Sequence, residues 1–168
     1  MFKIDLMQSR GGKSWDDGGC GEVAGILISY SASSINSLRF LCSKDGALKF
    51  SEDHGTLSDS TQMLQIRLDY PTEVLTEVHG FRWSTHVSWG YGLCSITFVT
   101  NKATYGPFGV KRSSLDDSVF KFQLGSEADS INGFHGTVNS HGRIDSIGVY
   151  LQTTTACPDN LMSRKIVK

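Results

Sequence analysis

The sequence lacks the long apolar run that a membrane-spanning helix needs. No stretch of the 168 residues approaches about 18 consecutive apolar side chains. Residues 1–10 also lack the apolar centre and the small-residue cleavage site of a secretory signal. We therefore expect no integral membrane protein, and a cytoplasmic location with the nucleus open as a second one. The length suits one domain of about 100–200 residues.

Neither charge sign is concentrated, and the cysteines are scattered. Sixteen Lys and Arg residues face seventeen Asp and Glu residues without forming a long block, so binding to the phosphates of a nucleic acid is not expected. The absence of a Cys-x-x-Cys pair gives no support to a zinc ribbon or a thioredoxin-type site. We expect reduced thiols, no metal and no cofactor. The four cysteines are Cys20, Cys42, Cys94 and Cys157.

Motifs of the common enzyme classes are missing as well. The chain has no Gly-x-Ser-x-Gly elbow and no phosphate-binding Gly-x4-Gly-Lys-Ser/Thr loop, and its five histidines lie in different segments. Asp16 and Asp17 could be paired catalytic carboxylates or calcium ligands, but neighbours on a strand point to opposite faces. The string Trp-Asp-Asp-Gly-Gly favours a turn instead. We expect no enzyme.

The periodicity of the sequence is that of β-strands. In residues 63–70, apolar side chains alternate with polar ones, as a strand with one solvated face requires. Asp45-Gly46 has the composition of a tight hairpin turn, and no segment of ten residues reads as an amphipathic helix. Short strands at this regular spacing predict an all-β sandwich, barrel or prism. The predicted strands span 24–30, 35–42, 47–51, 63–70, 73–78, 93–100, 119–124 and 144–151.

Three glycine-bearing segments hold the residues that suit a sugar site. Segment 11–15 has adjacent glycines, which let a ligand approach the main chain closely. Segment 80–92 concentrates four aromatic residues in one predicted loop, and segment 133–145 reads as a long polar loop ending in Asp145. A carboxylate, backbone N–H groups and an aromatic face together suit a pyranose. Each also has a simpler explanation, because Asp145 can cap a turn and the aromatics can cover the core.

Four strings in these regions make the chain resemble the jacalin-related lectins. They read GGKSWDDG, LTEVHG, SITFVTNK running into YGPFG, and GFHG followed by DSIGVYL. They follow one another in the family's order over residues 10–151. The resemblance implies a β-prism I fold of three four-stranded Greek-key sheets with pseudo-threefold symmetry. It implies a jacalin-type lectin domain over residues 1–151, followed by a C-terminal extension, 152–168, that need not be ordered.

The resemblance also implies a shallow sugar site where loops meet at one end of the prism. The backbone of Gly12 and of the loop before the last strand would donate hydrogen bonds, and Asp145 would accept them from sugar hydroxyls. The third wall would come from Tyr91, or from Trp89. The implied carbohydrate-binding residues are Gly12, Tyr91, Gly142, Arg143, Ile144 and Asp145. The loop departs from the family's Gly-x-x-x-Asp pattern, because His141 stands four residues before Asp145.

The implied function is a lectin for mannose- or glucose-type glycans or glycoproteins in plant defence. The uncut segment 11–12, with ten residues before it, is similar to the single-chain, mannose-preferring branch. Because one shallow site binds weakly, useful avidity would need a homodimer or a larger assembly. The string GFHGT and the insertion at 113–117 also resemble divergent plant members tied to virus resistance. They imply an alternative, a non-lectin interaction module that acts in antiviral resistance through protein partners.

Overall fold

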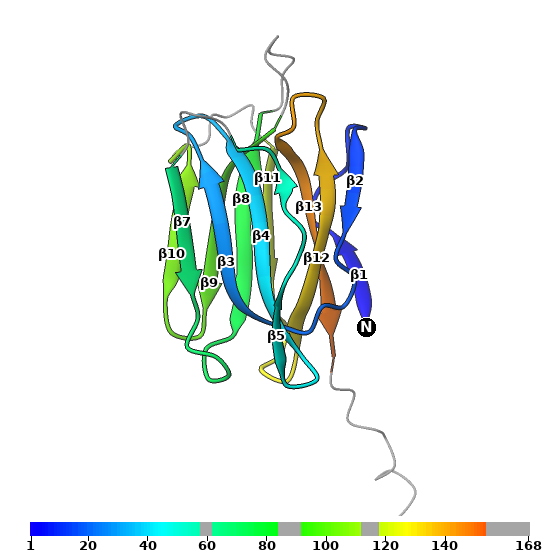
Figure 1. Cartoon of the computed structure of the whole chain (residues 1–168), viewed down its shortest axis with the longest axis vertical. Coiled ribbons are helices and arrows are strands. Elements are labelled where there is room, and N and C mark those ends of the chain that lie inside the picture. The colour runs from blue at the N-terminus through cyan, green and yellow to red at the C-terminus, as the bar shows by residue number, and fades with distance from the viewer. Residues whose placement is uncertain (58–61, 84–91, 112–117, 154–168) are drawn as a thin grey trace, which may run out of the picture.

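The computed structural model describes residues 1–57, 62–83, 92–111 and 118–153, and the regular structure in these ranges is entirely β-strand (Figure 1). The all-β prediction is confirmed. Among the described residues there is no helix long and apolar enough to cross a membrane. The strands are β1 (Phe2–Asp5), β2 (Lys13–Asp16), β3 (Glu22–Tyr30), β4 (Ile35–Lys44), β5 (Ala47–Phe50), β6 (His54–Gly55), β7 (Gln62–Arg67), β8 (Leu75–Arg82), β9 (Leu93–Thr100), β10 (Thr104–Gly109), β11 (Ser118–Gln123), β12 (Ser130–Val138) and β13 (Ile144–Gln152).

The strands form three antiparallel sheets that follow one connection pattern. Their orders are β5-β4-β3-β7, β10-β9-β8-β11 and β1-β13-β12-β2. In the first two, three consecutive strands are joined in series and the fourth returns beside the first, which is a Greek key. The third repeats this order if the chain ends are regarded as joined. This is the predicted prism, with one addition: the two-residue β6 also pairs with β4.

The core lies where the inner faces of the three sheets meet. Strand β4 alternates buried and partly exposed residues over most of its length, as the period of two predicts. Each sheet supplies one fully buried phenylalanine: Phe40 from β4, Phe98 from β9 and Phe134 from β12. The ring centroids of Phe40 and Phe134 are 4.0 Å apart and stacked, and Phe98 meets Phe134 edge-on at 6.5 Å. Phe134 therefore joins all three sheets.

Most of the predicted strands are present, and the predicted hairpin is confirmed. Asp45 and Gly46 join β4 to β5 with φ values of 53° and 78°, the positive pair that a tight hairpin turn requires. Two predicted loops are shorter than expected. Residues 133–138 belong to β12 and residues 80–82 to β8, so the loop before Asp145 consists only of 139–143.

Strand β12 was missed because its glycines hide the alternation of side chains. A Cβ at Gly136 would run into the carbonyl oxygen of Ser146 on β13 and into the ring of Trp15 on β2. Glycine here permits the close approach of neighbouring strands rather than a turn. The sequence pattern cannot separate these two uses of glycine.

The expectation of four reduced cysteines is wrong for two of them. Cys20 and Cys42 form a disulfide, with their Cα atoms 5.8 Å apart. Cys20 lies just before β3, and the antiparallel pairing of β3 with β4 places Val23 opposite Cys42. The proximity thus comes from a strand pairing that sequence spacing does not reveal. Cys94 is a buried thiol that lies 3.5 Å from the carbonyl oxygen of Gly92, and Cys157 lies outside the described residues.

Two further expectations fall on residues whose placement the structure does not describe. The insertion at 113–117 is one of them. The extension at 152–168 is the other, apart from its first two residues. Gln152 is the last residue of β13, so the final strand runs one residue beyond the predicted domain end.

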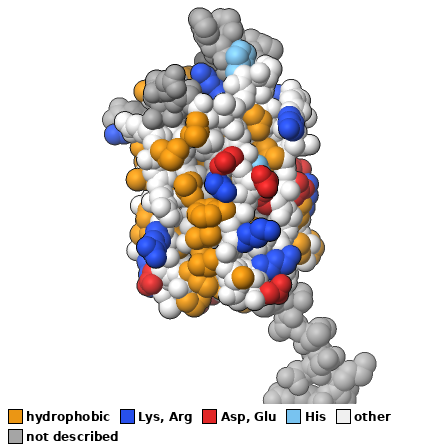
Figure 2. Space-filling view, viewed as in Figure 1, with side chains coloured by type: hydrophobic (Ala, Val, Ile, Leu, Met, Phe, Trp, Pro, Cys, Tyr) orange, Lys and Arg blue, Asp and Glu red, His pale blue; other side chains and the backbone are white. Residues whose placement is uncertain are grey.

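The face toward the viewer in Figure 2 carries a stripe of apolar side chains over the sheet that contains β3 and β4. Leu48 and Phe50 of β5 are 57% and 40% exposed. The guanidinium of Arg39 lies 4.8 Å from the ring centroid of Phe50, a cation–π contact. Strand β5 is at the lower end of the molecule in Figure 1, whereas the β12–β13 loop stands at the upper end. The apolar residues of β5 are therefore remote from that loop.

A cluster on the outer face of the sheet β1-β13-β12-β2 ties the first strand to the third sheet. Asp16 accepts hydrogen bonds from Lys3 Nζ at 2.6 Å and from the hydroxyl of Tyr150 at 2.7 Å. Burial acts to raise the pKa of Asp16, but the hydrogen bonds from Lys3, Tyr150 and the Gly18 N–H outweigh it and lower the pKa to about 2. The ionised form of Asp16 is therefore favoured in the folded chain.

This lowered pKa predicts a pH-dependent effect of Asp16→Asn. Because the folded pKa lies below the ordinary value of 3.8, the stabilisation is complete above that value and is lost as the pH falls toward 2. Urea denaturation should show the variant less stable than the parent at neutral pH, with a difference that shrinks below pH 4. The loss should be modest, because the Asp16 side chain is 40% exposed. A difference that stays constant down to the lowest pH would contradict the assignment.

Candidate functional site

A cavity of about 330 Å³ lies at the end of the prism that carries the β12–β13 loop. We call it the Asp145 cavity. It brings Gly12 and Asp145 together, two of the residues predicted for the sugar site, from opposite ends of the sequence. Its lining residues are Arg10, Gly11, Gly12, Lys13, Val138, Asn139, Ser140 and Asp145.

Asp145 is the second residue of β13, and its carboxylate has no hydrogen-bond donor from the described part of the chain. The side chain is only 2% exposed. The nearest cation is the guanidinium of Arg82, at the end of β8, whose Nη1 is 3.9 Å from Oδ2 of Asp145. That separation is too long for a direct hydrogen bond. Buried carboxylates normally have partners, so both oxygens of this carboxylate can still accept hydrogen bonds that the described residues do not supply.

Arg82, like the carboxylate of Asp145 that it faces, has buried polar atoms without a hydrogen bond to the described residues. Its side chain is 7% exposed, and its Nε and Nη1 atoms contact no acceptor in the described ranges. Burial and the nearby charge of Arg10 lower the pKa of Arg82, and Asp145 acts in the opposite direction. Arg10 itself donates from Nη2 to the carbonyl oxygen of Trp83 at 2.6 Å. Among the described residues, Arg82 and Asp145 therefore form a buried ion pair in which both side chains have atoms without a hydrogen bond.

Gly12 lines the cavity with its main chain. Its φ is +92°, and a Cβ at this position would collide with the carbonyl oxygen of Val138 on β12. Any other residue would have to move the segment away from β12. Position 12 therefore requires glycine, as both its backbone conformation and the nearby carbonyl group show. The backbone of Gly12 lines the same cavity as Asp145.

The loop 139–143 is organised by one asparagine. Oδ1 of Asn139 accepts the N–H groups of His141 at 2.9 Å and Arg143 at 3.1 Å. The carbonyl oxygen of Asn139 accepts the N–H of Gly142 at 3.0 Å. The two backbone donors expected for a sugar, at Gly142 and Arg143, are thus bonded inside the loop. Their role as sugar donors stays a prediction, because a ligand would have to share or replace these bonds.

The other predicted site residues are placed less directly. Ile144 is fully buried and belongs to the core, so its side chain offers no contact to a ligand. Tyr91 and Trp89 lie outside the described residues. The sequence reading missed Arg82 and Asn139. Asn139 carried a weak signal, since asparagine often bonds its own backbone in turns. Arg82 carried none beyond its place in segment 80–92.

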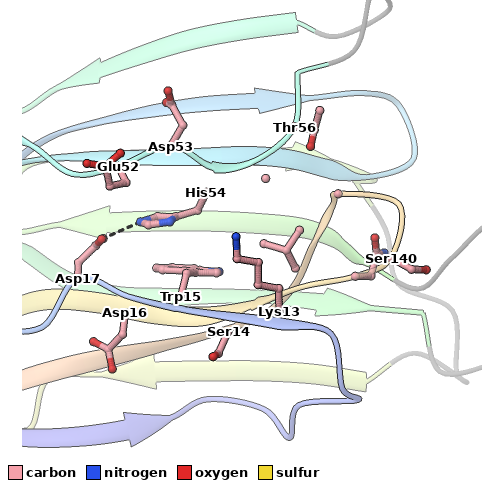
Figure 3. Close-up of a pocket in the computed structure, with 14 residues that line it drawn as sticks. Lys13, Ser14, Trp15, Asp16, Asp17, Glu52, Asp53, His54, Thr56 and Ser140 are labelled. Atoms are coloured by element: carbon pink, nitrogen blue, oxygen red, sulfur yellow. Dashed lines mark hydrogen bonds and ion pairs between the residues drawn. The ribbon is translucent and has the colours of Figure 1, made fainter.

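A second, larger cavity of about 650 Å³ adjoins the first (Figure 3). Asp17 Oδ1 lies 2.8 Å from Nε2 of His54, and the imidazole stacks on the indole of Trp15 with centroids 3.9 Å apart. The side chains of Asp17 and His54 are 7% and 5% exposed, so the pair supports the wall from within. Both cavities are lined by Lys13, Val138, Asn139 and Ser140.

The two adjacent aspartates do not form a paired site. Asp16 reaches Lys3 and Tyr150, whereas Asp17 reaches His54. This divergence is what strand geometry predicts, and a turn follows in which the Gly18 N–H donates to Asp16 at 2.8 Å. In the ranges that the structure describes, no three His, Cys, Asp or Glu side chains converge in a way that could hold a metal ion.

Comparison with known proteins agrees with this architecture. The family described as Jacalin-like lectin domain matches residues 5–150. The protein RESTRICTED TEV MOVEMENT 1 of Arabidopsis thaliana is 36% identical over 146 residues, covering 86% of this chain and 80% of the relative. Jacalin-related lectin 2 of the same plant is 32% identical over 149 residues, covering 86% and 79%.

Solved lectins have the same fold. A mannose-specific jacalin-related lectin from Morus nigra, in complex with mannose, superposes with a TM-score of 0.77 at 28% identity, covering 90% of this chain and 94% of that one. The artocarpin–mannotriose complex gives 0.77 at 25% identity, covering 90% and 97%. Single-chain recombinant jacalin gives 0.76 at 27% identity, covering 90% and 95%. By sequence and by structure, the chain belongs to the jacalin-like lectin family.

Proposed function

We propose that the chain is a lectin that binds mannose- or glucose-type glycans in the Asp145 cavity, without catalysis. The observation that carries the proposal is the buried carboxylate of Asp145, which faces a cavity without a hydrogen-bond donor from the described residues. Two neighbouring pyranose hydroxyls can each donate to one carboxylate oxygen, and such charge-assisted bonds are the stronger kind. The mannose and mannotriose in the complexes of two related lectins support the sugar class.

The Gly12 part of the cavity lining suits the same ligand. The Gly12 main chain can come close to a sugar because no side chain intervenes. A monosaccharide in one shallow site binds weakly, since a millimolar Kd corresponds to only about −4 kcal/mol. We therefore include a homodimer or larger assembly in the proposal, because two linked sites raise the avidity for branched glycans.

The proposed setting is plant defence in the cytoplasm, with the nucleus open as a second location. One observation weighs against that location: disulfides are rare in cytosolic proteins, and Cys20 is bonded to Cys42. A fluorescent fusion expressed in plant cells tests it. Fluorescence confined to the secretory pathway would overturn the cytoplasmic location.

Titration calorimetry with methyl α-mannoside and a branched oligomannose tests the lectin function. We expect saturable heat for the parent protein and, for Asp145→Asn, at least about a tenfold loss of affinity, since one carboxylate oxygen becomes a donor. Glu127→Gln makes the same chemical change at an exposed residue and should bind like the parent. Equal binding by Asp145→Asn, or no heat at tens of millimolar sugar, would refute the proposal.

A second candidate function is an interaction module on the same fold, acting in antiviral resistance through protein partners. The observation that favours it is the loop 139–143, whose Gly142 and Arg143 N–H groups are already bonded to Asn139. The likeness to RESTRICTED TEV MOVEMENT 1 adds to it. A virus-movement assay with Asp145→Asn separates the two: activity that survives the loss of sugar binding favours the module, and activity lost with it favours the lectin.

A further inference from the structure

The pairing of the strands places Arg82 beside Asp145 at the edge of the core. Arg82 lies opposite Leu93 in the pairing of β8 with β9. A Cβ on Gly92, the residue before Leu93, would lie 3.1 Å from the carbonyl oxygen of Ile144. Leu93 and Ile144 are fully buried, and the side chains of Arg82 and Asp145 are only 7% and 2% exposed. The ion pair therefore lies in a part of the prism that is shielded from water.

A carboxylate buried in this way needs a cation to stay ionised. Burial disfavours the charged form of an acid, whereas an opposite charge within about 4–6 Å favours it. Asp145 receives no hydrogen bond from the described residues, so the guanidinium of Arg82, with Nη1 at 3.9 Å from Oδ2, is the group that offsets its burial. The interaction is mutual, because Asp145 acts to raise the pKa of Arg82 against the effects of burial and of Arg10. The charge of each group thus supports the charge of the other.

We propose that Arg82 is a positioning residue of the Asp145 cavity, which keeps the Asp145 carboxylate ionised and thereby sets the lowest pH at which the cavity binds a sugar. The inference rests on the proposed lectin function and adds its dependence on pH. Both oxygens of an ionised carboxylate accept hydrogen bonds from sugar hydroxyls, whereas a protonated acid has less capacity to accept. Arg82 is not among the described residues that line the cavity, so it acts through Asp145 and not by contact with the sugar.

Four other charged or titratable residues belong to the cavity lining or to the adjoining loop, and they are exposed or half-buried. Charges in contact with water interact more weakly than buried ones, so we expect a smaller effect from them on Asp145. The titration of the imidazole among them is common to the parent and to variants at position 82, and a comparison between these proteins removes it. The four are Arg10 and Lys13 of the cavity lining and His141 and Arg143 of the loop 139–143.

Calorimetry with methyl α-mannoside between about pH 4 and 8 tests the inference. The parent protein should keep its affinity near neutral pH and lose it on acidification. Arg82→Met keeps the length of the side chain and removes its charge, so the midpoint of this loss should move to higher pH by at least about one unit. Arg82→Lys retains the charge and should stay close to the parent. Arg67→Met removes an exposed arginine on β7 and should match the parent.

Urea denaturation gives a second readout that needs no sugar. Without the cation, the buried carboxylate holds its proton more tightly in the folded state, so the stability of Arg82→Met relative to the parent should fall as the pH rises from about 4 to 8. Replacing Asp145 as well removes the charge that Arg82 balances. Arg82→Met/Asp145→Asn should therefore be more stable than Arg82→Met at neutral pH. An arginine with a merely structural role would give a loss that depends neither on pH nor on Asp145.

The two readouts together decide the role of Arg82. A higher binding midpoint, with a stability loss that Asp145→Asn relieves, supports the inference. An unchanged midpoint, or a stability loss that is equal at every pH and persists with Asp145→Asn, overturns it. If Arg82→Met does not fold, a folded double variant supports the inference and an unfolded one overturns it. No heat with the sugar for the parent protein refutes the lectin function, and the denaturation series then decides the role of Arg82 alone.

Discussion

Replacing Phe134 by alanine is expected to lower the free energy of unfolding by about 3–5 kcal/mol. The ring is fully buried, stacks on Phe40 at 4.0 Å and meets Phe98 edge-on. These three side chains come from three different sheets, so the cavity left by the ring lies where the sheets meet. Closing it would need all three sheets to shift. Urea denaturation followed by fluorescence measures the loss.

A control at the surface separates this effect from the mere loss of an apolar side chain. Val119 on β11 is 69% exposed, and its replacement by alanine should change the stability by less than about 0.5 kcal/mol. A loss below about 1 kcal/mol for Phe134→Ala would mean that the sheets do collapse onto the vacant space. The packing of Phe134 against Phe40 and Phe98 would then not hold the three sheets rigidly in place.

Asp17→Ala should cost about 2–3 kcal/mol, because it leaves the buried imidazole of His54 without its partner. The imidazole is held between that carboxylate, 2.8 Å away, and the indole of Trp15. His54 connects the β5–β6 side of the adjoining cavity to β2, so the loss should also loosen the segment that carries Gly12. Thermal and urea denaturation measure the stability.

A double-mutant cycle with His54→Ala tests whether the two residues act together. The loss in the double variant should be smaller than the sum of the single losses by at least about 0.5 kcal/mol. Asp53→Ala, which removes a 71% exposed carboxylate next to His54, is the matched control and should be nearly neutral. Strict additivity of Asp17→Ala and His54→Ala would show that the short contact contributes no coupling.

Strands whose alternation is regular could be predicted from the sequence, and strands that depend on glycine could not. The sequence predicts β7 and β11 because apolar and polar side chains alternate in residues 63–70 and 119–124. Strand β12 replaces side chains with glycine where β2 and β13 come close, as at Gly136. The prism itself followed from the resemblance, since alternation leaves sandwich, barrel and prism equally open.

The candidate site shows the same division. Gly12 and Asp145 were identified by their place in family strings, and the structure brings both to one cavity. Arg82 could not be identified in that way, because its ion pair with Asp145 depends on the approach of the end of β8 to the start of β13. The Cys20–Cys42 bond was missed for a related reason: it depends on the register of two paired strands.

The third sheet is assembled from the two ends of the chain, and this has a consequence for the order of events during synthesis. The sheets β5-β4-β3-β7 and β10-β9-β8-β11 are each made of strands close in sequence, so they can pair while translation continues. Strand β1 pairs with β13, and β2 pairs with β12. These pairings can form only after the last strands have been synthesised. Contacts between distant segments form slowly. The Asp145 cavity, which needs Gly12 from one end of the chain and Asp145 from the other, should accordingly be the last feature that a nascent or refolding chain forms.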